Sequence, residues 1–174
     1  MARLEKFSIF SLITIAVSTL IIPLLYSQTV TANDKQVSGW IENVAVGDPP
    51  FMIRAKIDSG AKHSSLHAGK YQLYEKQGAE WIRFTLKNKE GESVVIDRPV
   101  KRVTQIKQKG NLPNRKRHVV ELGVCMGNVY KVVEVNLADR TNFNYPMLVG
   151  RSFLQGSIVV DSGEKYIFSP NCKR

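Results

Sequence analysis

The sequence has little histidine, and this limits the metal chemistry that it can support. Its 174 residues include three histidines. His63 and His67 are four residues apart, a spacing that places two metal ligands on one face only in a helix. The residues around them indicate a loop followed by a strand, with no glutamate between them to act as a metallopeptidase base. The sequence therefore predicts no metal site and no other cofactor.

Cysteine is scarcer still: the sequence has two, Cys125 and Cys172. In an oxidising compartment the two thiols can pair and join the C-terminus to the body of the domain. Two separate thiols are the alternative, and the sequence leaves this choice open. Cys125 has His118 nearby in the chain but no evident third residue to orient a cysteine–histidine pair. No serine lies in a Gly-x-Ser-x-Gly context, so a serine nucleophile is also not supported.

Acidic residues are few relative to basic ones, 15 against 25, and the net charge is +10. Eight of the cations lie between Asp97 and His118, where Asp97 is the only opposing charge: Arg98, Lys101, Arg102, Lys107, Lys109, Arg115, Lys116 and Arg117. Aromatic residues do not interleave with them, which argues against nucleic acid as a partner. This basic stretch is either a solvated loop or a region that attracts acidic peptides or an anionic envelope polymer.

Long hydrophobic runs are limited to residues 7–26, which follow Arg3 and Lys6 and contain Pro23. Val30-Thr31-Ala32 then supplies small residues of the kind that a signal peptidase reads. The run is also long enough to cross a bilayer as an uncleaved anchor. We therefore predict a signal peptide or membrane anchor in residues 1–32, with cleavage near Ala32 favoured. Residues 33–174 are expected to form one exported, periplasmic domain, either soluble or anchored to the inner membrane.

Long amphipathic helical patterns are scarce after residue 33, and short strand patterns separated by turn signals prevail. The predicted strands cover residues 40–46, 51–57, 64–68, 81–87, 93–96, 118–124, 129–137, 157–161 and 165–168. A short helix is predicted from Arg151 to Gln155, where Gly156 ends it. Strands this short and this regularly spaced predict an all-β fold, a small closed barrel with one short C-terminal helix.

The segment Asp58-Ser59-Gly60-Ala61 follows one of these strands directly. A carboxylate followed by a hydroxyl and two small residues is what an aspartic peptidase needs. Asp58 would lie on a tight turn, the Ser59 hydroxyl would brace it, and Gly60 and Ala61 would let another backbone segment come close. One such loop provides half of an active site, because a pair of carboxylates activates the water.

Five blocks in this order resemble the bacterial retropepsin-like aspartic peptidase family, formerly labelled putative ATP-dependent zinc protease. They are residues 58–61, 64–68, 117–120, 136–140 and 145–151, and the resemblance covers about residues 37 to 163. The family often has threonine after the aspartate and a small polar residue where His63 stands, so Ser59 and His63 depart from its pattern. The resemblance implies a retropepsin (acid protease) fold. Residues 147–150 would be its late glycine segment, and a hairpin with its tip between Val100 and Arg115 would be the flap over the substrate.

The second carboxylate needs a source. Asp161-Ser162-Gly163 repeats the motif, but only 11 residues follow it and Glu164 stands where close packing needs a small residue. We interpret it as a strand ending in a turn, and Asp139 beside Arg140 as a turn or an ion pair. The remaining source is Asp58 of a second copy, which two-fold symmetry would bring to the first. Such a pair shares one proton and activates water without a metal or a covalent intermediate.

The sequence thus predicts an exported, homodimeric aspartic endopeptidase with Asp58 as its catalytic residue. Ser59, Gly60 and Ala61 shape the loop, and the substrate is a peptide or protein, with acidic substrates compatible with the net charge. Four further residues are candidates to face the substrate: His63, His67, Arg117 and Arg151. The alternative is a non-catalytic retropepsin-like module that binds an anionic peptide or polymer through its basic flap region.

Overall fold

The computed structural model describes residues 35–106, 110 and 113–172. The signal peptide or anchor that the sequence predicts in residues 1–32 lies outside these residues. Residues 107–109 and 111–112, in the predicted flap tip, lie outside them too. Within the described residues, no helix combines the length and the apolar character that a membrane crossing requires.

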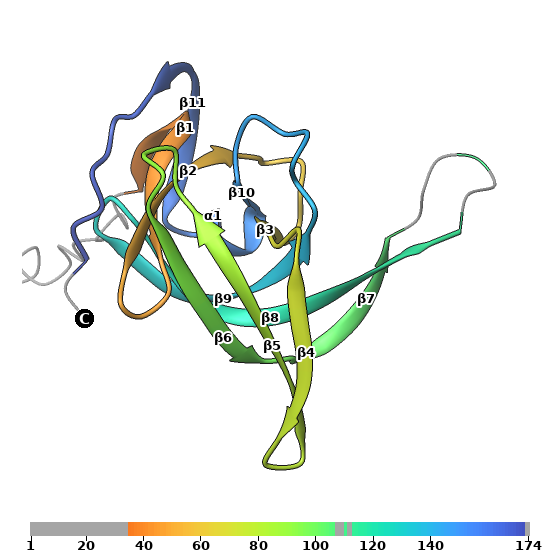
Figure 1. Ribbon diagram of the computed structural model, residues 1–174. Helices are drawn as coiled ribbons and strands as arrows, with labels where there is room; N and C mark the ends of the chain where they lie inside the picture. The colour runs from red at the N-terminus through yellow and green to blue at the C-terminus, as the bar shows by residue number, and fades with distance from the viewer. Residues whose placement is uncertain (1–34, 107–109, 111–112, 173–174) are drawn as a thin grey trace, which may run out of the picture. The chain divides into compact units, whose positions relative to one another are not determined.

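Strands dominate the part of the chain that the structure describes, and they form two sheets (Figure 1). The larger sheet has the order β11-β1-β2-β10-β3-β9-β8-β7, and the smaller has the order β4-β5-β6. The elements are β1 (Gln36–Val46), β2 (Phe51–Ile57), β3 (Ser64–His67), β4 (Tyr71–Lys76), β5 (Ala79–Lys87), β6 (Ser93–Pro99), β7 (Arg102–Ile106), β8 (Arg115–Met126), β9 (Val129–Ala138), β10 (Met147–Val149), α1 (Arg151–Leu154) and β11 (Ile158–Lys165).

The larger sheet closes on itself through a second pairing of β1. Besides its pairing with β2, β1 pairs with β8, where Ala45 lies opposite Cys125 and Val46 opposite Val124. The strands β1, β2, β10, β3, β9 and β8 therefore form a ring, and β11 and β7 extend beyond it. This arrangement confirms the all-β fold with one short C-terminal helix.

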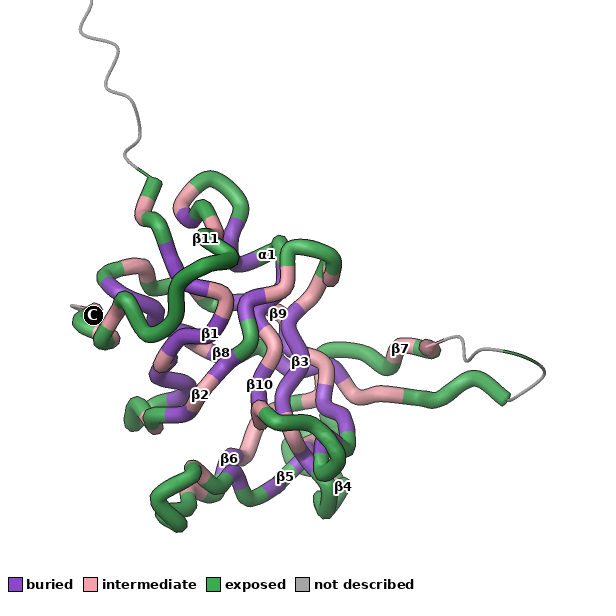
Figure 2. The backbone as a smooth tube through the Cα atoms, turned by 90° about the horizontal axis from the view of Figure 1, so that it is seen from above, coloured by how far each residue is buried: buried purple, intermediate pink, exposed green. Residues whose placement is uncertain are grey.

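The smaller sheet lies between β3 and β7 in the chain and covers the core with one face. Along β5, Ile82, Phe84 and Leu86 are buried whereas the residues between them are exposed or half-buried, as the two-residue period of a strand requires. They belong to the same core cluster as Leu66 of β3 and Phe153 of α1. Figure 2 shows buried stretches along strands of both sheets. Strand β4 was missed in the sequence because nearly all its side chains are exposed, which leaves no alternation to recognise.

The basic stretch forms the hairpin of β7 and β8, whose far ends leave the rest of the sheet as a two-stranded arm (Figure 1). Two of its cations have acidic partners on neighbouring strands. Lys101 pairs with Glu121 of β8, and Arg102 with Glu134 of β9 at 2.6 Å. The stretch is therefore less unopposed than its sequence indicates, because these acids lie elsewhere in the chain.

A strand predicted at residues 165–168 is wrong. Tyr166 has a φ of 55°, and the chain leaves β11 at that residue. The following residues are held by the fully buried carboxylate of Glu42 in β1, which accepts hydrogen bonds from the backbone N–H groups of Ile167 and Phe168, each at 3.1 Å. Three hydrogen bonds to this carboxylate, counting Gly39 N–H at 2.7 Å, compensate for its burial.

A polar network joins the three strands of the smaller sheet on its outer face. The Tyr74 hydroxyl donates to both carboxylate oxygens of Asp97 at 2.7 Å, and Arg83 Nη2 donates to Asp97 Oδ2 at 2.7 Å. The Tyr74 hydrogen bond and then the Arg83 contacts favour the ionised carboxylate and lower the pKa of Asp97.

We expect this network to make the free energy of unfolding depend on pH in the acidic range. A carboxylate whose pKa is lowered on folding stabilises the protein at neutral pH, and that contribution is lost as the pH falls from the ordinary value of 3.8 toward the folded-state value. Asp97→Asn should be less stable than the parent near neutral pH. It should also lose less stability between about pH 5 and about pH 2, measured by urea unfolding. Equal losses in the two proteins would contradict the role given to Asp97.

The two cysteines, whose pairing the sequence left open, form a disulfide. Their Cα atoms are 6.0 Å apart, and the bridge spans 47 residues between Cys125 of β8 and Cys172. The neighbouring Asn171 N–H donates to Gly127 O at 2.7 Å. The C-terminal residues are therefore fastened to the turn between β8 and β9.

Removing this bridge should lower the free energy of unfolding by about 2–4 kcal/mol, because a closed loop of this length restricts the unfolded chain. Cys172→Ser tests this by urea unfolding. A reductant should bring the parent protein to the stability of the variant and leave the variant unchanged. A parent that is insensitive to reductant would show that the bridge adds no stability.

Candidate functional site

Asp58 lies on a tight loop directly after β2. Its backbone N–H donates to Val149 O of β10 at 2.9 Å. Its Oδ1 atom accepts hydrogen bonds from the backbone N–H groups of Gly60 at 2.9 Å and Ala61 at 3.2 Å. The carboxylate is therefore fixed through one oxygen. The side chain is half-buried, and Oδ2 accepts no hydrogen bond from the described residues.

Gly150 lets the backbone after β10 approach the backbone after this loop. A Cβ atom at Gly150 would lie 2.7 Å from the carbonyl carbon and oxygen of His63, which real Cβ atoms do not do. The Gly150 N–H also donates to the buried Ser64 Oγ at 3.1 Å. Its φ of −96° suits any residue, so the need for glycine comes from space and not from backbone conformation.

Helix α1 holds the loop through Arg151. The guanidinium donates from Nη1 to Ser59 O at 2.9 Å and to Gly60 O at 2.8 Å. The backbone N–H of Arg151 donates to Ala61 O at 2.9 Å, and that of Ser152 to Lys62 O at 2.9 Å. Four hydrogen bonds from one helical turn thus fix the carbonyl groups of the loop.

Two details differ from the sequence prediction. The Ser59 side chain is exposed, and its hydroxyl makes no hydrogen bond within the described residues, so Arg151 supplies the bracing that the motif assigned to Ser59. A Cβ atom at Gly60 would meet only Asp58 Oδ1, at 3.1 Å. The close approach of two backbone segments therefore takes place at Gly150, and Gly60 makes room for the carboxylate instead.

Arg117 reaches the same region from the predicted flap. Its Nη1 donates to Asn136 Oδ1 at 3.0 Å, and Asn136 Nδ2 donates to Ser64 O at 2.6 Å. Burial lowers the pKa of the Arg117 guanidinium, and the charge of Arg115 acts in the same direction. Arg117 thus links β8 to the strand that follows the Asp58 loop.

The two histidines have different surroundings. His67 Nδ1 accepts the backbone N–H of Arg140 at 2.9 Å, which requires the tautomer protonated at Nε2. His63 Nδ1 is buried and lies 4.0 Å from Glu134 Oε2, beyond hydrogen-bonding distance. The described residues contain no group of three or more histidine, cysteine, aspartate or glutamate side chains that could hold a metal ion.

The sequence predicts that Arg140 forms a turn or an ion pair with Asp139, whereas in the structure its contacts are with Tyr145 and Phe143. Its side chain is 8% exposed, its Nε donates to Tyr145 O at 3.1 Å, and its guanidinium lies 4.4 Å from the Phe143 ring centre. Burial lowers the pKa of Arg140, and the positive charge of Arg117 adds to this effect. The negative charge of Asp58 acts in the opposite direction. Arg140 is therefore an electrostatic neighbour of Asp58.

The second Asp-Ser-Gly does not form a second loop of this kind. Asp161 lies within β11, in register with Gly39 of β1, and its Oδ1 accepts the N–H of Gly163 at 2.8 Å. The register of β11 on β1 is irregular between Gly39 and Ile41. The motif is therefore a local irregularity inside an edge strand, where the sequence predicted the end of a strand.

Known proteins with similar sequences and structures agree with this geometry. The family described as "Retropepsin-like aspartic endopeptidase RimB" matches residues 37–171. Proteins from Shewanella pealeana and Parasynechococcus marenigrum, each named "Probable alpha-L-glutamate ligase", are 30% and 31% identical over 129 and 125 residues. The matches cover 73% and 70% of this chain but 28% and 26% of those proteins, so the chain spans about a quarter of their length.

A solved structure is similar as well. The crystal structure of a Legionella pneumophila protein, described as having unknown function, superposes with a TM-score of 0.64 at 30% identity. The similarity covers 77% of this chain and 98% of that one. The fold is thus shared over nearly the whole of the Legionella protein.

The seating of the loop can be tested at Gly150. Gly150→Ala should lower the free energy of unfolding by about 1–3 kcal/mol, because the new methyl group must push two backbone segments apart. Gly163→Ala is the matched control, since its Cβ atom would meet only the exposed Asp161 Oδ1, at 3.3 Å. Urea unfolding compares the two variants. Equal, small effects would mean that the loop does not depend on this contact.

Proposed function

The chain belongs to the RimB-like family of retropepsin-like aspartic endopeptidases, and from this premise we propose that it is an exported, homodimeric aspartic endopeptidase. Asp58 of each copy supplies one carboxylate of the active site.

The observation that carries the proposal is the seating of a single Asp58. Its loop is fixed by Val149, Gly150 and Arg151, and the carboxylate keeps one oxygen without a partner among the described residues. Such fixation is what an acid–base group needs, because proton transfer depends on geometry before it depends on pKa. Residues 35–106, 110 and 113–172 offer one such carboxylate, so a symmetric second copy is the simplest way to complete the pair.

In the proposed mechanism the two Asp58 carboxylates share one proton. The ionised member accepts a proton from water as the water oxygen attacks the carbonyl carbon of the peptide bond. The protonated member donates a hydrogen bond to the carbonyl oxygen. This hydrogen bond stabilises the negative charge that develops on that oxygen in the tetrahedral intermediate. A proton then passes from the pair to the leaving amine, the C–N bond breaks, and the shared proton is restored.

An acidic substrate is supported by charge. The chain carries a net charge of +10, and Arg117 and Arg140 lie near the Asp58 loop. The relatives are named for glutamate ligation, and joining glutamates to a protein produces an acidic chain.

Export is supported by the leader pattern of residues 1–32 and by the disulfide of Cys125 and Cys172, which persists in oxidising compartments.

A second candidate is a non-catalytic module that binds anionic peptide or polymer. It is favoured by the curated relatives, in which the region similar to this chain is about a quarter of a longer protein. A retropepsin-like domain in such a protein can serve for binding alone. A monomer in which Asp58 faces solvent would fit this candidate.

Replacing the carboxylate tests the first candidate. Asp58→Asn should abolish hydrolysis of a fluorogenic peptide library that includes acidic members, while its thermal unfolding stays close to that of the parent. The parent should sediment as a dimer and be inhibited by a pepstatin-type compound. An Asp58→Asn protein that cleaves at the parental rate would refute the catalytic assignment, and an inactive parental monomer would favour the binding module.

A further inference from the structure

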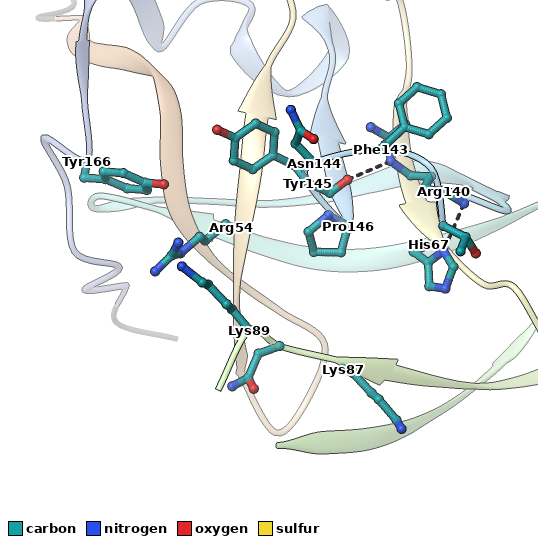
Figure 3. A pocket seen from close by; sticks show the side chains of 12 residues that line it. Arg54, His67, Lys87, Lys89, Arg140, Phe143, Asn144, Tyr145, Pro146 and Tyr166 are labelled. Atoms are coloured by element: carbon teal, nitrogen blue, oxygen red, sulfur yellow. Dashed lines mark hydrogen bonds between the residues drawn. The ribbon is translucent and has the colours of Figure 1, made fainter. Parts of the chain in front are cut away.

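A pocket of about 420 Å³ is lined by 12 residues, none of them from the Asp58 loop (Figure 3). It includes Arg140, on which the charge of Asp58 acts. Both sheets contribute to it. Arg54 comes from β2 and His67 from β3, whereas Lys87 and Lys89 come from the end of β5 and the turn before β6. Tyr145 and Tyr166 complete much of the wall. Its volume lies within the range of pockets that bind small ligands or peptide side chains.

The lining is basic and contains no aspartate or glutamate. Arg54 is partly compensated, because it lies 3.9 Å from Glu90 and 5.6 Å from the Tyr166 ring centre. Lys87 and Lys89 are exposed and have no ion pair within the described part of the chain. Their charges therefore act on whatever enters the pocket.

Arg140 also lines this pocket, and its surroundings indicate that an anionic partner is missing. It is more than nine-tenths buried, yet no carboxylate of the described residues lies within ion-pair distance of its guanidinium. One hydrogen bond from Nε to Tyr145 O leaves most of its donors unused. Its guanidinium also lies 4.4 Å from the Phe143 ring centre, a contact that offsets part of the cost of burial. A buried cation with no carboxylate at ion-pair distance still costs stability that an apolar side chain of the same size would not. A bound anion would remove this cost.

We propose that this pocket is an anion-binding subsite for the carboxylates of an acidic peptide, with Arg140 holding the group nearest Asp58 and Lys87 and Lys89 holding groups farther along. The turn between β5 and β6 is then a specificity element, and the smaller sheet supplies it. This places the recognition of acidic residues in the pocket and not on the basic flap. That the ligand is a peptide rests on the proposed function, whereas the preference for an anion rests on the residues that line the pocket.

Binding can be measured without turnover. In an Asp58→Asn background, an N-acetylated, C-amidated tetraglutamate peptide should bind, and its tetraglutamine counterpart should not, by isothermal titration calorimetry. Lys87→Ala/Lys89→Ala should weaken tetraglutamate binding about tenfold or more, since charge-assisted hydrogen bonds are lost. The matched control is Arg115→Ala/Lys116→Ala, which removes the same charge from exposed positions on β8. Equal or greater weakening by the control would overturn the proposal.

Arg140 is tested by two substitutions in the same background. Arg140→Met should abolish tetraglutamate binding without lowering the melting temperature, because it removes a buried charge that has no carboxylate at ion-pair distance among the described residues and replaces it with an apolar side chain of similar length. Arg140→Lys should retain part of the affinity. A lower melting temperature with unchanged binding would make Arg140 a structural residue and contradict its assignment.

Phosphate is the rival source of negative charge. Inorganic phosphate should displace tetraglutamate no better than sodium chloride of equal ionic strength. Tight phosphate binding that depends on Lys87 and Lys89, without tetraglutamate binding, would contradict the peptide assignment. Because all these measurements use Asp58→Asn, a parent protein that binds tetraglutamate but never cleaves a peptide would contradict the proposed peptidase alone.

Discussion

The contact between two backbone segments, one after β2 and one after β10, is the constraint on which the site depends. At Gly150 the segments are so close that a methyl group would collide with the carbonyl group of His63. This approach allows the first turn of α1 to donate hydrogen bonds to the carbonyl groups of the Asp58 loop. The buried Phe153 fixes α1 to the core, so the position of the carboxylate is set by packing far from the carboxylate itself.

The same constraint explains why the described residues contain one seated aspartate loop of this kind. A second seated loop would need its own glycine segment and its own helix, and Asp161 has neither, since it lies in the edge strand β11. The surroundings of Asp58 are basic, with Arg140 buried nearby and Arg117 connected to the loop's far end through Asn136. Under the proposed function this positive charge attracts acidic peptides, and the β5–β6 region of the smaller sheet adds Lys87 and Lys89 to the pocket that Arg140 lines.

Local patterns in the sequence were enough to predict the all-β fold and the position of Asp58 on a loop directly after a strand. The alternation of residues 51–57 matches β2, and the Asp-Ser-Gly-Ala segment lies in the predicted loop. What the sequence could not supply was pairing between distant segments. The sequence pairs Arg140 with its neighbour Asp139. In the structure the backbone N–H of Arg140 donates a hydrogen bond to Nδ1 of His67, 73 residues earlier. The bracing by Arg151 similarly joins residues more than 90 positions apart, and strand β4 has no alternation because it is exposed on both faces. The disulfide depended on a distance that no spacing reveals.

Subunit mixing tests the central claim, that two copies of Asp58 form one catalytic pair, most directly. Parent protein is equilibrated with a threefold excess of Asp58→Asn, and peptide hydrolysis is measured per parental chain. If each active centre needs Asp58 from both copies, random exchange leaves about one quarter of the parental chains with a parental partner. The expected activity per parental chain is then about one quarter of its unmixed value. Activity that stays unchanged after subunits have exchanged would contradict the account, because each chain would then carry a complete centre of its own.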